Sequence, residues 1–305
     1  MSFDLTPGED LRQILEAARA MLDSHYPVAR LQEGMGGDDL GPLEDFGAFA
    51  LALPEESGGA GFSIVEEAHL HVALGRHLVG PGALATAIAR RLDAGVTACI
   101  GVAGDGTWTL VDPEGAVHAV IRVDGGFGLS PVTDPKTTAP LGAGLPVAKM
   151  ARTGTNRPLD ADLARLLAAA QLLGVATGAR DLAVDYAKIR EQFGQPIGTF
   201  QAIKHHTANM TLGIEMVSAL LDMAAIALYD GHPDAGFQVA ALTRLAPRIA
   251  LDNARTGIQI HGGIGFSAED VAKLVLIGAS FRSIGTRYPW LCLWTDWAKG
   301  LPPGA

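Results

Sequence analysis

An arginine beside a turn-rich loop is the first feature of this sequence that could bind an anion. Arg190 falls at the end of a helical pattern, and the loop after it contains Phe193, Gly194 and Pro196. The planar guanidinium of an arginine can make two parallel hydrogen bonds to a phosphate or a carboxylate. A phenylalanine next to it could stack on a flat ring. Arg190, Gln192 and Phe193 are therefore candidate ligand-binding residues.

A pair of glycines near the end of a later helical pattern is the second such feature. Gly262 and Gly263 would let a ligand approach the backbone closely, and a helix expected from Ser267 would offer free N–H groups to an anion. With Arg190 and Gln259 they form a candidate pyrophosphate cradle. A solvated arginine and an ordinary glycine helix terminus would give the same spacing, and on spacing alone this second interpretation is the commoner one.

Long helices must position both features. After residue 151 the apolar periodicity predicts four helices joined by short loops, which indicates an antiparallel four-helix bundle. Asp160 or Asp162 would cap the first, and Asp234 the third. The four are expected from about Asp160 to Ile189, Thr199 to Tyr229, Asp234 to His261, and from Ser267 onward.

Two further segments precede the bundle. Residues 1–95 have helical texture, with a helix over Pro7 to Leu22 and a capping box formed by Ser63 and Glu66. Residues 96–150 contain short β-branched runs between glycine and proline turns, which predict three or four antiparallel strands. The runs are Ala98–Val102, Thr107–Val111 and Val117–Val123, and the stretch from Pro131 to Pro146 is expected to lead out of the sheet. The predicted fold is mainly α: a helical domain (1–95), a reduced antiparallel β domain (96–150) and the bundle (151–305).

Composition excludes several classes of protein. The chain has 305 residues and a formal net charge of −10, so it lacks the basic field of a nucleic-acid-binding protein. Two cysteines, Cys99 and Cys292, form neither a disulfide framework nor a zinc site and suit a reducing compartment. The N-terminus has no signal-peptide pattern, and the most apolar run, 166–179, is short for a membrane span. A soluble cytoplasmic protein is expected.

Both candidate features match long motifs of one family. Residues 186–205 (YAKIREQFGQPIGTFQAIKH) and 259–266 (QIHGGIGF) closely resemble two signatures of the acyl-CoA dehydrogenases, in the same order. Residues 54–61 (PEESGGAG) resemble an N-terminal turn of that family, and Gly75 to Leu78 followed by Pro81 also fits. The resemblance covers both ends of the chain well and the middle poorly.

The resemblance implies FAD bound at a subunit interface and α,β-dehydrogenation of an acyl-CoA thioester. It also implies roles for six residues of this chain. Arg190, Gln192 and Phe193 would touch the FAD of a neighbouring subunit, and Gln259, Gly262 and Gly263 would contact its pyrophosphate and adenosine side.

The catalytic base of the family is missing. The reaction needs a carboxylate to remove the α-proton of the thioester. Where the family usually places a glutamate, this chain has Ile284, and at the alternative position in the first bundle helix it has Ala164. Glu269 and Asp270 lie nearby, but at a helix start, where capping is the better interpretation. No catalytic residue is therefore assigned.

The middle segment also lacks the family stretch that contacts flavin and substrate. The chain thus resembles the small subunits of actinobacterial heteromeric acyl-CoA dehydrogenases, α2β2 assemblies that act on steroid-derived CoA thioesters. A catalytic partner subunit would supply the base and the flavin-ring and acyl-CoA pockets. One alternative is a self-sufficient homodimer with a displaced base, Glu215 or Asp222. Another is a flavin-free scaffold or regulatory protein of the same fold.

Other residues favour plain interpretations. His205, His206 and His261 have no Cys, Asp or Glu at ligand spacing, which disfavours a metal site. Trp290, Trp294 and Trp297 share a helical face that suits packing, and the Glu55–Glu56 pair is expected to face solvent.

Overall fold

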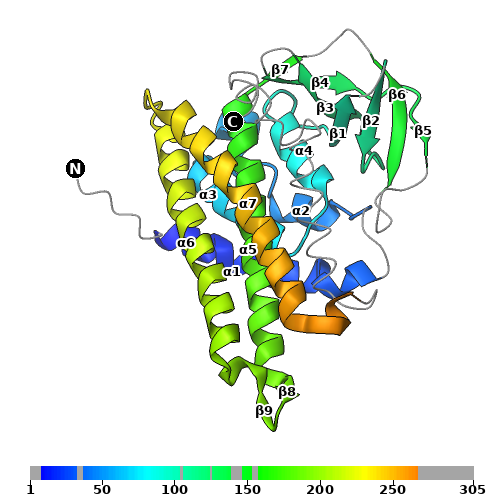
Figure 1. Cartoon of the computed structure of the whole chain (residues 1–305). Coiled ribbons are helices and arrows are strands. Elements are labelled where there is room, and N and C mark those ends of the chain that lie inside the picture. The colour runs from blue at the N-terminus through cyan, green and yellow to red at the C-terminus, as the bar shows by residue number, and fades with distance from the viewer. Residues whose placement is uncertain are drawn as a thin grey trace, which may run out of the picture.

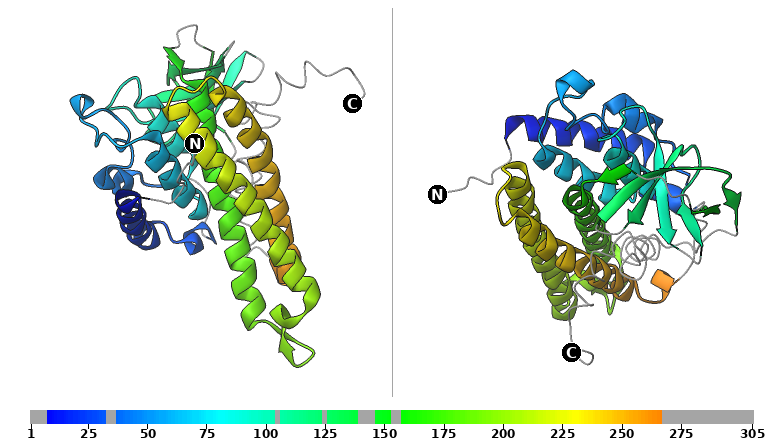
Figure 2. Two further views of the ribbon diagram at one scale, coloured as in Figure 1. Left: turned by 90° about the vertical axis from the view of Figure 1, so that its left-hand side faces the viewer. Right: turned by 90° about the horizontal axis from the view of Figure 1, so that it is seen from above.

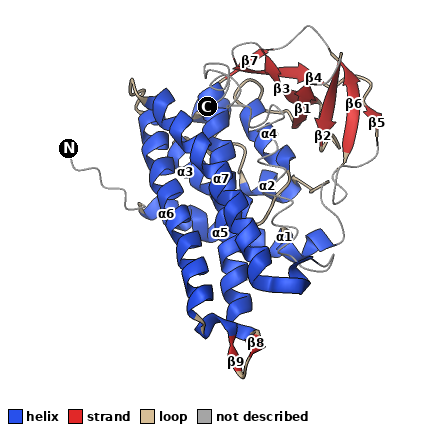
Figure 3. Cartoon of the chain, viewed as in Figure 1, coloured by secondary structure: helices blue, strands red, loops and turns tan. Residues whose placement is uncertain are grey.

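A helical region and a β-sheet lie side by side in the computed structural model (Figure 1). The structure describes residues 8–32, 37–103, 106–123, 126–138, 146–152 and 157–266. Helices from the two ends of the chain form one body, and the sheet covers one end of it (Figure 3). The strands of the sheet lie between Ala98 and Leu159. The domain boundaries at residues 95 and 150 remain predictions.

The N-terminal region is helical, as predicted. Its expected capping box is present, because the Ser63 side chain accepts from Val65 N–H while Glu66 accepts from Ser63 N–H. Thr86 ties this region to the sheet, since its Oγ1 accepts a 3.0 Å hydrogen bond from the Ala98 N–H. The elements are α1 Glu9–His25, the 3-10 turn η1 Val28–Gln32, α2 Gly41–Phe46, the 3-10 turn η2 Glu55–Ser57, α3 Ile64–Arg76 and α4 Pro81–Ala89.

The sheet is larger than predicted and it is mixed. Its strand order is β5-β6-β2-β1-β3-β4-β7, and β1 pairs parallel with β3 while the other pairs are antiparallel. Strand β2 folds back on one edge of β1 as a hairpin. The chain then crosses to the other edge of β1, where β3 pairs with it in parallel. The strands are β1 Ala98–Ala103, β2 Thr107–Val111, β3 His118–Val123, β4 Gly126–Pro131, β5 Lys136–Thr137, β6 Val147–Ala151 and β7 Arg157–Leu159.

Two expectations about this sheet were therefore wrong. A wholly antiparallel sheet of three or four strands is replaced by seven strands with one parallel pair. The stretch from Pro131 to Pro146 does not lead out of the sheet, because β5 lies within it and β6 follows it immediately. The short edge strands β5 and β7 have two and three residues, too few for a pattern of alternating polarity to show.

Three long helices form the described part of the C-terminal bundle. They are α5 Ala161–Ile189, α6 Gln201–Tyr229 and α7 Ala235–His261, close to the predicted bounds. Asp160 is the N-cap of α5, and its side chain accepts hydrogen bonds from the N–H groups of Asp162 and Leu163. Asp234 is the N-cap of α7, but its side chain makes no capping hydrogen bond. The fourth helix expected from Ser267 lies outside the described residues.

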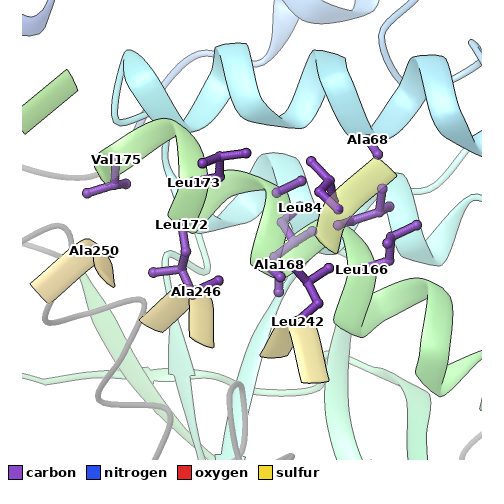
Figure 4. Close-up of a cluster of buried hydrophobic side chains, with 14 of the residues drawn as sticks. Ala68, Leu84, Leu166, Ala168, Leu172, Leu173, Val175, Leu242, Ala246 and Ala250 are labelled. Atoms are coloured by element: carbon purple, nitrogen blue, oxygen red, sulfur yellow. The ribbon is translucent and has the colours of Figure 1, made fainter. Parts of the chain in front are cut away.

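Helix α5 is the centre of the core. It packs against α3, α6 and α7, and views from two further directions show it between the N-terminal helices and the rest of the bundle (Figure 2). Leu172 of α5 lies beside Ala246 of α7 (Figure 4), and Leu166, Val175 and Leu242 belong to the same buried cluster. Gly75 of α3 and Gly174 of α5 let the two backbones touch, because a Cβ at either would lie 2.0 Å from a carbonyl oxygen of the other helix.

Candidate functional site

A short hairpin at one end of the bundle carries three of the six candidate residues. Between α5 and α6 the strands β8 Glu191–Gln192 and β9 Gln195–Pro196 pair antiparallel, where a loop was expected (Figure 1). Phe193 and Gly194 form the turn with φ of 56° and 78°, the geometry of a type I′ turn. Phenylalanine rarely adopts this conformation, and its side chain here is 93% exposed. The fold thus holds a large aromatic ring in solvent at a projecting tip.

Arg190 has a fixed backbone and an unengaged side chain. It caps α5, its N–H donates to Tyr186 O at 2.9 Å, and its carbonyl accepts from Ile197 N–H at 2.8 Å. The guanidinium is exposed, and within the described part of the chain it makes no hydrogen bond or ion pair. The next candidate, Gln192, donates a 2.9 Å hydrogen bond from its side-chain amide to the carbonyl of Glu191, its one side-chain hydrogen bond among the described residues. Both side chains are available to a ligand or to another subunit.

The end of α7 carries the other three candidates. Gly262 ends the helix with φ 65° and ψ −138°, and its N–H bonds to Gln259 O and Ile258 O. Gln259 and Gly263 are exposed, and a Cβ added at Gly262 or Gly263 would meet nothing within 4 Å. Gly262 needs its positive φ, but neither space nor backbone conformation within the described chain requires glycine at position 263.

A stacked pair that sequence reasoning missed joins the two motifs. The rings of Tyr186 and His261 lie 4.3 Å apart with an interplanar angle of 23°. Tyr186 is in the last turn of α5 before Arg190, and His261 is the last residue of α7 before Gly262. His261 is buried, and its Nδ1 lies 2.7 Å from Gly257 O, so Nδ1 carries the proton and donates. Both residues stood inside the quoted motifs, but nothing in the sequence showed that they touch.

The described residues place no carboxylate at the position expected for a base. Ala164 is buried in α5 at 5% exposure, while Ile284, Glu269 and Asp270 lie outside the described residues. The candidate displaced bases sit on α6, the bundle helix on the side away from the sheet (Figures 1 and 2). Asp222 is engaged by His69 Nε2 at 3.0 Å, and Glu215 is exposed.

The remaining candidates lie apart from this end of the bundle or make no cluster. Within the described ranges no group of three or more His, Cys, Asp or Glu side chains could hold a metal ion. His205 and His206 are exposed on α6, and Glu55 and Glu56 face solvent. Burial raises the pKa of the Cys99 thiol to about 12, so it is inert near neutral pH. Cys292 and the three tryptophans of the predicted last helix lie outside the described residues.

Comparison with known proteins identifies the family. The C-terminal domain of acyl-CoA dehydrogenases matches residues 160–285. Acyl-CoA dehydrogenase IpdE2 of Mycobacterium tuberculosis is 32% identical over 290 residues, which cover 87% of this chain and 89% of that protein. This chain belongs to the acyl-CoA dehydrogenase family. The prediction made from the two motifs is confirmed, and with it the family's use of FAD.

Two solved structures are similar over nearly the whole length. A variant of the Tcur3481-Tcur3483 steroid ACAD superposes with a TM-score of 0.76 at 26% identity and covers 93% of this chain and 94% of its own. The ChsE4-ChsE5 complex from Mycobacterium tuberculosis gives 0.75 at 21% identity, covering 98% and 100%. The predicted fold class, with helical ends and a β middle, is confirmed, apart from the mixed sheet.

The six candidate residues fit an FAD held from outside the chain. They present a cation, amide donors, an open backbone and an exposed ring, which suit a pyrophosphate and a flat nucleotide base. All six sit on the surface at the two ends joined by the Tyr186–His261 stack, with Gly262 half-buried.

Proposed function

We propose that this acyl-CoA dehydrogenase homologue is the base-less subunit of a heteromeric α2β2 enzyme and completes the FAD site of a catalytic partner subunit. The observation that carries the proposal is the exposure of Arg190 and Phe193 on a projecting hairpin. Among the described residues the Arg190 guanidinium has no hydrogen bond or ion pair, and the Phe193 ring is 93% exposed although it meets Phe200 edge-to-face at 6.2 Å. A large apolar ring is unfavourable to leave in solvent, and a cofactor bound by another subunit would cover it. The phosphates of the same cofactor would pair with the guanidinium of Arg190.

Each residue has a distinct task in this assembly. Arg190 binds the pyrophosphate with charge-assisted hydrogen bonds, and Gln192 and Gln259 add amide donors. Phe193 stacks on the nucleotide, and the open backbone at Gly262 and Gly263 lets the cofactor approach closely. The FAD that these residues would hold would supply the acceptor for the hydride of the thioester β-carbon.

The partner supplies what this chain lacks. Ala164 offers no proton acceptor, so the base and the acyl-CoA pocket are assigned to the partner subunit. The two solved neighbours support such an assembly, since one is a complex of two named chains and the other is called a steroid ACAD. On that basis we assign a steroid-derived CoA thioester as the substrate class. We also propose the cytoplasm as the compartment, because the two isolated cysteines suit a reducing environment.

The first experiment is to express the chain alone and together with a catalytic dehydrogenase from its genomic neighbourhood. FAD content, mass and dehydrogenase activity are measured for both preparations. The proposal expects FAD and activity only in the complex. Stoichiometric FAD and activity in the chain alone would instead support a homodimer with Glu215 or Asp222 as base. A colourless complex would support a flavin-free scaffold.

The second experiment tests the role of Arg190. In the complex, Arg190→Ala should weaken FAD binding about tenfold or more, because a charged hydrogen-bonding partner of the pyrophosphate is lost. Arg248→Ala is the matched control, since Arg248 is also an exposed bundle arginine, with only a 3.9 Å contact to Asp252. Equal FAD affinity in both variants would refute the assignment.

A further inference from the structure

The exposed ring at the tip of the β8–β9 hairpin has a neighbour at the start of α6. The rings of Phe193 and Phe200 have centroids 6.2 Å apart and an interplanar angle of 89°, which is an edge-to-face contact. Phe193 is 93% exposed, whereas Phe200 is partly buried. The solvated ring of Phe193 therefore rests against a second ring that is better covered.

Phe200 occupies a position where helix formation does not favour phenylalanine. It ends the 3-10 turn η3 Ile197–Thr199 and is the N-cap of α6. Helices prefer Ser, Thr, Asp or Asn as N-cap, because their side-chain oxygen accepts a hydrogen bond from a free N–H group. Phe200 cannot do this, and α6 has no side-chain cap. An aliphatic residue would pack against the bundle equally well, so the contact with Phe193 is the feature that needs an aromatic ring.

The backbone around Phe200 is fixed to the end of α5. Its N–H donates to Ile197 O at 3.1 Å, and the Ile197 N–H donates to Arg190 O at 2.8 Å. Gly198 of η3 lies so close to α5 that a Cβ there would be 3.0 Å from Ala187 O. The end of α5, η3 and Phe200 thus form a rigid base beneath the hairpin.

The Phe193 side chain, in contrast, is fixed by little else. Its φ of 56° sets the direction of the Cβ, in a region that phenylalanine rarely adopts. The backbone does not choose among the side-chain rotamers, and a ring so exposed would sample several of them. Contact with the anchored ring of Phe200 selects one rotamer before any ligand arrives.

We propose that Phe200 is a positioning residue of the FAD site, whose ring holds the Phe193 ring in the orientation in which it stacks on the nucleotide. The inference rests on the proposed function, since it takes Phe193 as a residue that contacts the cofactor. Ordering the ring in advance removes a rotamer entropy that binding would otherwise cost. Phe200 therefore raises the affinity for FAD without touching it.

The first test uses the full-length chain without cofactor or partner. NMR of a sample labelled on its 10 phenylalanines identifies the ring signals of Phe193 by their loss in Phe193→Leu. A ring held edge-to-face has proton shifts displaced by the ring current of its neighbour. We expect displaced shifts in wild type and in Phe200→Tyr, and the shifts of a freely rotating phenylalanine in Phe200→Leu. Shifts of a freely rotating ring already in wild type would overturn the proposal.

The second test is a double-mutant cycle on FAD affinity in the complex with a catalytic subunit, followed by flavin fluorescence. Phe200→Leu should raise the dissociation constant of FAD about threefold or more, and Phe200→Tyr should keep the wild-type value. In a Phe193→Leu background, Phe200→Leu should have no further effect, because the ring that it positions is gone. Phe62→Leu is the matched control, since Phe62 is also a partly buried phenylalanine but lies in the N-terminal region, and it should change nothing.

The cycle separates the positioning role from the proposed function. If Phe193→Leu leaves FAD affinity unchanged, Phe193 is no cofactor contact and both fail. If Phe193→Leu weakens FAD binding but Phe200→Leu does not, the positioning role alone is overturned. Equal losses from Phe200→Leu in both backgrounds would overturn it too, because Phe200 would then act on the cofactor by a route that does not pass through Phe193.

Discussion

The contact between α3 and α5 and the surface formed by the hairpin and the end of α7 use glycine in opposite ways. At the contact, a Cβ on Gly75 would lie 2.0 Å from Gln171 O, and one on Gly174 would lie 2.0 Å from Val72 O. On the surface, a Cβ on Gly194 or Gly263 would meet nothing within 4 Å. The fold requires the first two glycines for space. Among the described residues nothing requires glycine at position 263, so a requirement there would have to come from outside the described part of the chain.

The largest effect is expected at the helix contact. Gly174→Ala places a methyl group against the backbone of α3, where no flexible side chain can move aside. We expect a loss of about 3 kcal/mol or more in the free energy of unfolding, which is at the upper end of the destabilisation that overpacking a core usually causes. Urea denaturation of the chain alone measures it. A loss below about 0.5 kcal/mol would show that the helices separate easily.

A buried histidine beside the same contact makes stability depend on pH. Burial, and then the charge of Arg91, lowers the pKa of His71 from 6.5 to about 3. The folded state keeps the ring neutral while the unfolded chain binds a proton below pH 6.5. The stabilising contribution is thus complete above pH 6.5 and is lost as the pH falls towards 3.

This pH dependence can be measured by comparing wild type with His71→Gln. Between pH 6.5 and 5, wild type should lose about 2 kcal/mol more of its unfolding free energy than the variant. Urea titrations at the two pH values provide the comparison. Parallel losses in both proteins would mean that His71 does not stay neutral in the fold.

Local signals in the sequence predicted the helices, whereas contacts between distant segments were not predictable. The capping box of Ser63 and Glu66 and the N-cap of Asp160 form within one helical turn. The residue types alone therefore predict where these helices begin. The parallel pairing of β1 with β3 depends on which edge of β1 is free after β2 has folded back. The six site residues came from motif resemblance, but the Tyr186–His261 stack between them depends on how α5 and α7 cross.

The stack joins the two parts of the second region, the hairpin after α5 and the end of α7. Tyr186→Ala removes the ring from His261 and frees the end of α5 relative to the end of α7. We expect about 1 kcal/mol of lost stability from the aromatic pair and weaker FAD binding in the complex. Tyr186→Phe keeps the stacked ring and should restore both. If Tyr186→Ala lowers stability but FAD affinity is unchanged, the stack does not position the cofactor residues.

The smallest effect on stability, and the sharpest contrast with Gly174, is expected at Gly263. Gly263→Ala meets no atom within 4 Å and needs no positive φ, so the unfolding free energy should change by less than about 0.5 kcal/mol. FAD retention by the complex should nevertheless fall, because the added methyl group occupies the space that the cofactor approaches. Gly95→Ala is the control, since Gly95 is equally open and exposed but lies before β1, and it should change neither quantity. Full FAD retention in Gly263→Ala, measured by flavin absorbance after gel filtration, would mean that this glycine faces solvent and that the open backbone at the end of α7 has no cofactor beside it.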